Sequence, residues 1–141
     1  MGAPARTGVK VGDVMTELIR PVTQAQIDAY AQASGDHNPI HVNEAFARSV
    51  GLSGTIAHGL LEMGMLAEAV ATWAGGAEHV AALAVRFSKP LFPGDTITCT
   101  GTVSAVDIER ARATLDLEAV SSRGDRVLTN GRAEVRLHLE A

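Results

Sequence analysis

The residues of this chain that are best suited to proton chemistry lie in one short segment. Residues 35–41 read Gly-Asp-His-Asn-Pro-Ile-His, with a carboxylate at Asp36 and an imidazole at His41. A carboxylate and an imidazole that meet at one water molecule can remove one proton and deliver another, as the addition or removal of water requires. Gly, Asp, Asn and Pro are also common turn formers, so from spacing alone a plain turn between two helices is the simpler explanation.

A second candidate is residues 55–60, Thr-Ile-Ala-His-Gly-Leu, which precede an apolar stretch expected to be helical. The first N–H groups of a helix have no partner within it and carry partial positive charge. Gly59 would let a substrate carbonyl oxygen approach the backbone, because no Cβ stands in the way. Close packing of this glycine against another element explains it equally well.

Other reactive residue types have simpler explanations. We expect no metal site, because Pro39 breaks the helix that would point His37 and His41 at one ion, and no finger-like Cys or His pair is present. Ser53 lies in a sequence that differs from the nucleophile-elbow motif Gly-x-Ser-x-Gly, because Thr55 stands in place of the second glycine, and it is expected to be a loop residue. Cys99 falls on the inward face of an alternating strand, as a buried inert thiol does. Three arginines are expected on solvated strand faces rather than in a phosphate site: Arg112, Arg132 and Arg136.

The elements around the first segment are helices with clear end signals. Thr23 and Gln26 form a capping-box pattern, and Gly35 ends the helix that follows. Pro39 is expected to keep the next residues out of a helix. Asn43 then caps a short helix over 44–50.

The second half of the chain alternates with the period of a sheet. Residues 59–74 are apolar on nearly every face and predict a helix enclosed on most sides. The alternation after it predicts antiparallel strands with one wet face, after a first strand within 9–22 and with a hairpin turn at 123–125. The strands are expected over 79–88, 97–105, 111–119 and 127–139.

The size of the chain fits one domain. Its 141 residues suffice for a hydrophobic core without disulfides. A content of 46% hydrophobic and 20% charged residues argues against a disordered chain. We expect residues 1–8 to form a flexible N-terminal tail and residues 9–141 to form a single domain.

Charge and cysteine content narrow the class of partner and compartment. A net charge of -4 and only one Trp, one Tyr and three Phe argue against a nucleic-acid partner. Residues 1–8 lack the apolar region of a signal peptide, and the longest apolar stretch, 60–73, contains Glu62 and Glu68 and is shorter than the ~20 residues of a membrane span. The single cysteine favours a reducing compartment. We therefore expect a cytoplasmic protein without a membrane partner.

Four stretches together resemble the MaoC-like family of (R)-specific enoyl-CoA hydratases and (3R)-hydroxyacyl-ACP dehydratases. The hydratase motif of that family is similar to residues 30–41, which contain Asp-x-Asn-Pro-x-His. The other stretches agree in type and order, and the similarity covers about residues 9–139: Ala57-His58-Gly59, Val85-Arg86-Phe87 and residues 89–95.

The resemblance implies an α+β hot-dog fold, an antiparallel sheet wrapped around one long central helix, usually dimerised. It also implies that Asp36 and His41 hold the catalytic water, with His41 as the main base for attack at C3 and Asp36 passing a proton to C2. The Gly59 N–H would bind the thioester oxygen, and Asn38 would orient the segment beside it in the substrate-binding part of the site. No metal and no cofactor are implied.

One departure from the family concerns the central helix. Some hydratases of the family carry a serine there that faces the site, whereas this chain has no serine between residues 54 and 87. Gly64 and Ala67 occupy the region, so hydrogen bonding on the thioester side and substrate choice are left open.

We expect a reversible enoyl-thioester hydratase, or (3R)-hydroxyacyl-thioester dehydratase, of fatty-acid metabolism. CoA or acyl carrier protein would carry the acyl group of the substrate. The chain would form a homodimer, and a heterodimer is the alternative. The alternatives are a hot-dog acyl-thioesterase and a partner or acyl-binding subunit of a heteromeric dehydratase. The Asn-Pro-x-His continuation speaks against the first, and the intact Asp36 and His41 speak against the second.

Overall fold

Five antiparallel strands form one sheet in the order β1-β3-β4-β5-β2. The computed structural model describes residues 5–139. The strands are β1 (Leu18–Pro21), β2 (Val80–Phe87), β3 (Thr96–Asp107), β4 (Arg112–Ser121) and β5 (Arg126–Arg136). The α-helices are α1 (Gln24–Ser34), α2 (Pro39–Val42), α3 (Glu44–Ser49) and α4 (Gly59–Ala74), and a short 3₁₀ turn spans Ala77–His79.

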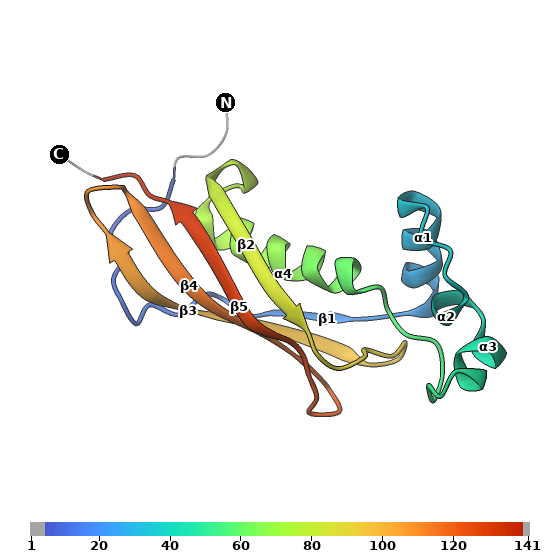
Figure 1. Cartoon of the computed structure of the whole chain (residues 1–141). Helices are drawn as coiled ribbons and strands as arrows, with labels where there is room; N and C mark the ends of the chain where they lie inside the picture. Colours follow the sequence, from blue (N-terminus) through green and yellow to red (C-terminus); the bar gives the residue numbers. More distant parts are fainter. Residues whose placement is uncertain (1–4, 140–141) are drawn as a thin grey trace.

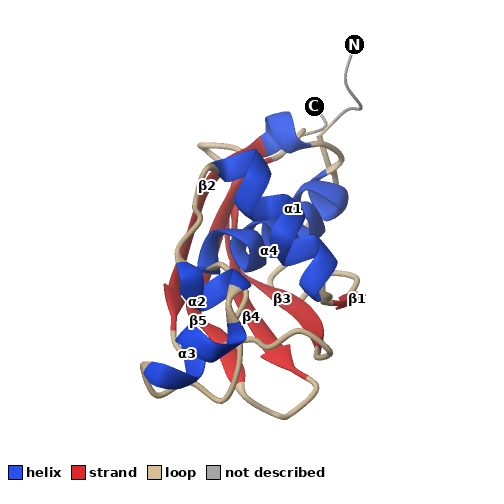
Figure 2. Ribbon diagram, turned by 90° about the vertical axis from the view of Figure 1, so that its right-hand side faces the viewer, coloured by secondary structure: helices blue, strands red, loops and turns tan. Residues whose placement is uncertain are grey.

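The long helix α4 lies along one face of the sheet, and α1, α2 and α3 gather beyond its N-terminal end (Figure 1). Seen from the side, the helices cover one face of the sheet, and the sheet curves around α4 (Figure 2). This is the hot-dog arrangement, so the expected fold is confirmed.

One face of α4 packs against the sheet. Leu66 and Val70 are completely buried, one helical turn apart, and burial of such a side chain stabilises the fold by about 1.5–3 kcal/mol. The opposite face is open, since Leu60 is 62% exposed and Gly64 is exposed as well. The prediction of a helix enclosed on most sides is therefore wrong for this face. The helix ends at Gly75, whose φ of 90° suits glycine.

The central strands follow the predicted alternation except at bulges. Cys99 and Val103 are buried on the inward face of β3, as expected. The register with β4 shifts between Val103 and Ala105, and as a result Ala105 is exposed and Val106 packs against the core. A bulge adds one residue to a strand and reverses the faces beyond it, which the alternating pattern alone did not reveal.

The helices that carry the first candidate segment follow the predicted caps with one exception. The capping box at Thr23 is present, and Gly35 ends α1 with a φ of 77°. Pro39, however, begins the one-turn helix α2, with Asn38 as its N-cap. The expectation that proline keeps these residues out of a helix is wrong, because the first helical position needs no N–H and suits the fixed φ of proline.

The ends of the chain differ in detail from the prediction. The first strand is confined to β1, four residues long, and within residues 5–17 the pairing is an isolated bridge from Val14 to Thr102. The last strand ends at Arg136. Of the predicted tail, residues 1–4 lie outside the described residues, while the Arg6 guanidinium donates to the Trp73 carbonyl at 3.1 Å. Among residues 5–139, no helix has the length and apolar character needed to cross a membrane.

Candidate active site

The ring of His41 is held in a definite orientation. His41 lies in α2 and is 7% exposed. Its Nδ1 donates a hydrogen bond to the Ile56 carbonyl, with the two atoms 2.8 Å apart. Since a carbonyl oxygen only accepts, Nδ1 carries the proton of the neutral ring and Nε2 keeps a lone pair. This tautomer makes Nε2 the basic atom of the ring.

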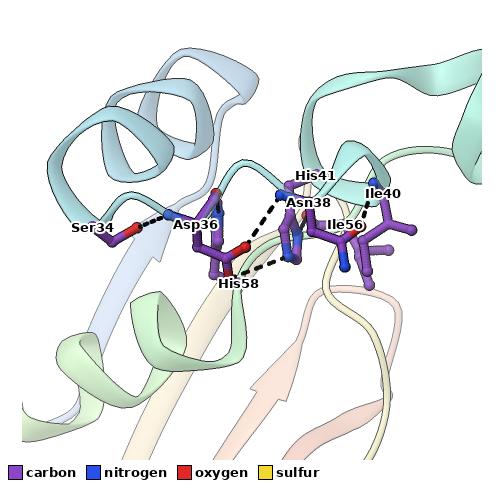
Figure 3. A network of polar contacts seen from close by, with 7 residues as sticks. All are labelled: Ser34, Asp36, Asn38, Ile40, His41, Ile56 and His58. Carbon is purple, nitrogen blue, oxygen red and sulfur yellow. Dashed lines mark hydrogen bonds and ion pairs between the residues drawn. The ribbon is translucent and has the colours of Figure 1, made fainter.

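Asp36 presents one carboxylate oxygen to that lone pair (Figure 3). Its Oδ2 lies 3.9 Å from Nε2 of His41, and the side chain is 53% exposed. The other oxygen, Oδ1, accepts the backbone N–H of Asn38 at 3.2 Å, which fixes the carboxylate. At this separation one water molecule can lie about 2.8 Å from both atoms and bridge them from one side. The structure thus brings together the two groups that the sequence singled out.

Asn38 shapes the chain between the two groups. Its side-chain oxygen accepts the N–H of Ile40 at 3.2 Å and so caps α2. A short polar residue at this position satisfies a helix N–H that would otherwise be unpaired. The contact orients the backbone that carries His41.

His58 is a contributor to the site that sequence reasoning placed in a motif but gave no function. Its ring stacks on that of His41, with centroids 3.8 Å apart, and its Nε2 donates to the Asp36 carbonyl at 3.1 Å. The ring of Tyr30 lies 4.7 Å from it on another side. His58 therefore links α1, the segment of Asp36 and the start of α4, and its position in a His-Gly pair was the only signal in the sequence.

A second brace holds the backbone of His41. The Gln24 amide donates to the His41 carbonyl at 2.8 Å and to the Asp28 carboxylate at 2.9 Å. The buried Thr55 hydroxyl donates to the Gln24 side-chain oxygen at 2.6 Å. Sequence reasoning missed Gln24, because it contacts the site only once α1 and the loop before α4 are packed together.

The structure gives a packing reason for the glycine at the start of α4. A Cβ on Gly59 would lie 2.8 Å from the Phe87 ring, which is closer than carbon atoms pack. Phe87, on the edge strand β2, is itself 53% exposed. The Gly59 N–H belongs to the first turn of α4, whose donors have no acceptor within the helix, so both explanations for this glycine remain compatible with the geometry.

Asp36, His41 and His58 also form the kind of cluster that can hold a cation. Each offers one ligand atom, and these atoms lie within 4.8 Å of one another. The ring nitrogens that carry protons donate to carbonyls, which leaves a lone pair on Nε2 of His41 and on Nδ1 of His58. The latter is buried and has no partner among residues 5–139. His37, which the sequence paired with His41, is exposed and is not in this cluster.

One buried acid near the start of α4 was not anticipated. Glu62 is 4% exposed, and its Oε1 has no hydrogen-bond partner in the part of the chain that the structure describes. Burial raises the pKa of this carboxyl from 4.5 to about 8, because an apolar surrounding disfavours the charged form. Cys99, also buried, has its thiol pKa raised to about 11, mainly by burial, as expected for an inert thiol.

Comparisons with known proteins show the family of the chain. A family model described as "MaoC like domain" matches residues 9–122. The chain is 32% identical over 108 residues to the mitochondrial 3-hydroxyacyl-[acyl-carrier-protein] dehydratase of Arabidopsis thaliana, covering 77% of this chain and 63% of that protein. It is 30% identical over 125 residues to the 3-hydroxybutyryl-CoA dehydratase of Methylorubrum extorquens, covering 87% and 78%.

A solved structure shows the same fold. The (R)-hydratase from A. caviae involved in PHA biosynthesis superposes with a TM-score of 0.85 at 27% identity, covering 94% of this chain and 99% of that one. The chain spans less than two thirds of the Arabidopsis relative, 63% of its length. Because the family model covers most of the residues and the relatives agree over the same region, the chain belongs to the MaoC-like dehydratase family.

Proposed function

We propose that this chain adds water reversibly to trans-2-enoyl thioesters and gives (3R)-hydroxyacyl thioesters. The observation that carries the proposal is the placement of a basic imidazole nitrogen and a carboxylate oxygen around the space of one water. Nε2 of His41 and Oδ2 of Asp36 lie 3.9 Å apart, and the Ile56 carbonyl at 2.8 Å sets the tautomer of His41.

The bond changes follow from these positions. His41 accepts a proton from the water as the water oxygen forms a bond to C3 of the enoyl group. The C2–C3 double bond becomes single, and its electrons develop as an enolate on the thioester oxygen. The N–H groups at the start of α4, with Gly59 first, would stabilise that charge. The proton then passes from His41 through Asp36 to C2 as the enolate electrons return to form the C–H bond. In total, one O–H bond and the C2–C3 π bond are broken, and one C–O and one C–H bond are formed.

The names of the relatives support this reaction class and leave the handle of the substrate open. One relative is named for a substrate on acyl carrier protein and another for a CoA thioester. The A. caviae enzyme is named an (R)-hydratase, in keeping with the (3R) product proposed here. We assign the handle to either CoA or acyl carrier protein, and a rate comparison between the two carriers decides it.

The active form in this proposal is a homodimer. β2 pairs with β5 on one side, and it stands at the end of the sheet order. An unpaired strand edge favours pairing with another chain, and a closed two-fold pair is the commonest oligomer. Light scattering that finds an active monomer would contradict the homodimer, whereas activity that requires a different subunit would establish a heterodimer. The cytoplasmic location stays a prediction.

The test is incubation with crotonyl-CoA. Loss of the enoyl absorbance without release of free thiol is the expected result. Release of thiol would establish the thioesterase alternative, and the absence of both changes would favour a non-catalytic acyl-binding subunit.

An unchanged hydration rate after exhaustive chelation is also expected, because the proposed chemistry uses only a water. A rate that is lost on chelation and restored by a divalent ion would overturn the proposal that no metal takes part.

A further inference from the structure

A groove runs between α1 and the open face of α4. It has a volume of about 620 Å³. Tyr30 lines it from α1, and Leu61, Gly64 and Met65 line it from α4. Its lining is mostly apolar along this part, which suits a hydrocarbon chain.

The groove adjoins the candidate active site at Tyr30 and Leu60. Tyr30, in its wall, has its ring 4.7 Å from the ring of His58. Leu60, another lining residue, directly follows Gly59 at the start of α4. A thioester held at Gly59 would therefore have its acyl chain at the entrance of this groove.

The middle of the groove is open because of Gly64. A Cβ built on Gly64 has no atom within 4 Å, so the space above this residue is free of protein. Because glycine has no side chain, a ligand can approach the helix backbone at this point.

The far end of the groove is closed by charge. Arg20 from β1 and Glu68 from α4 both line it, and the Arg20 guanidinium donates to the Glu68 carboxylate. Their side chains are 39% and 49% exposed, so both charges are still hydrated. A hydrocarbon that covered this pair would strip water from two charges without offering them a partner, which is unfavourable.

We infer that the Arg20–Glu68 pair sets the longest acyl chain that the enzyme accepts, an inference that rests on the proposed hydratase function. The distance from Gly59 to Glu68 along α4 is about 13 Å at 1.5 Å per residue. An extended chain advances about 1.3 Å per carbon, so about ten carbons reach the pair. The substrates of this site are therefore apolar enoyl thioesters of up to about ten carbons.

The first experiment measures kcat/KM over enoyl-CoA substrates of increasing length. In the unchanged protein, kcat/KM is expected to rise by up to about fourfold for each added methylene and to fall beyond about ten carbons. Gly64→Leu places a side chain in the groove, where its Cβ has no protein atom within 4 Å, and is expected to lower kcat/KM for the longer substrates about tenfold or more. Thr72→Leu, an exposed position on the same helix that does not line the groove, is the matched control with an unchanged profile.

The second experiment removes the charges. The double variant Arg20→Met/Glu68→Leu replaces the pair by apolar side chains and is expected to move the upper limit to longer substrates by two to four carbons, about the length of these side chains. Glu68→Gln keeps the shape but removes one charge and is expected to shift the limit less. Thermal melts of each variant show whether it is folded.

The outcomes separate this inference from the proposed function. If crotonyl-CoA is not hydrated by the unchanged protein, the proposed function is wrong. If crotonyl-CoA is hydrated but Gly64→Leu and the charge-free variant keep the profile of the unchanged protein, the acyl chain lies elsewhere and the inference is overturned. If Gly64→Leu shortens the profile but the folded double variant Arg20→Met/Glu68→Leu keeps the same upper limit, the acyl chain lies in the groove, but the inference that the ion pair sets its length is overturned.

Discussion

Replacement of Glu62 by methionine is expected to stabilise the protein and to flatten the pH dependence of its stability. Glu62 is 4% exposed, and its Oε1 has no hydrogen-bond partner within residues 5–139. Methionine has a similar length, forms helices well and adapts to irregular apolar space. The substitution therefore removes a buried polar group without opening a cavity.

The magnitude follows from the pKa of the carboxyl. Burial raises it from 4.5 to about 8, so the folded state keeps this proton over a pH range in which the unfolded chain loses it. The full contribution is present below pH 4.5 and is lost as the pH rises to about 8. At about 1.4 kcal/mol per pKa unit, the free energy of unfolding falls by about 5 kcal/mol across this range from Glu62 alone.

The assay is urea unfolding at pH 5, 7 and 9, at one protein concentration so that association affects all samples alike. The gain of Glu62→Met over the unchanged protein should increase from pH 5 to pH 9. Glu44→Met, at an exposed carboxylate paired with Arg48, is the control and should change stability by less than about 1 kcal/mol at each pH. A Glu62→Met protein that is less stable at pH 9 would refute the reasoning, because it would mean that the carboxylate has a stabilising partner.

The site supports three more predictions. Asp36→Asn and His41→Ala should each reduce the rate of crotonyl-CoA hydration by ~10²–10⁴-fold. Because both residues act on one water, the rate loss of the double variant should be much smaller than the product of the two single losses. His37→Ala should leave the rate nearly unchanged, and a His37 variant as inactive as the His41 variant would reverse the assignment. Gly59→Ala should destabilise the fold, because the new Cβ would clash with the Phe87 ring, and adding Phe87→Ala should restore the melting temperature. If the melting temperature recovers but the hydration rate does not, the glycine also contributes to substrate binding. If both the melting temperature and the rate recover, the glycine is required for packing alone. Hydration in deuterated water should give (R)-3-hydroxybutyryl-CoA with oxygen and deuterium on the same face, because both proton-handling groups come from one short segment; chiral analysis that finds an (S) product would contradict the proposed stereochemistry.

Local signals in the sequence were sufficient for most elements of this fold. The bounds of α4 were predicted correctly because a mostly apolar stretch begins at Gly59 and ends before Gly75. The capping box at Thr23 and the turn at 123–125 depend on residues close in the chain. Such signals do not require knowledge of the tertiary structure, so one sequence contains them.

The arrangement of the site could be predicted only in part. Asp36 and His41 were identified by residue type and spacing, but the tautomer of His41 depends on the Ile56 carbonyl, 15 residues away. The stacking of His58 and the brace from Gln24 likewise arise from packing between elements. The bulge after Val103 reverses the faces of β3 without any change in composition that would announce it.

The shortness of α2 has a consequence for the thermal stability of the site around His41. A helix of four residues has too few internal hydrogen bonds to persist alone, so His41 keeps its place through contacts from Gln24 and Ile56. These few bonds can open while the sheet and α4 remain intact. Thermal inactivation is therefore expected to precede the melting of secondary structure, and amide protons of α2 should exchange with solvent well before those of β4.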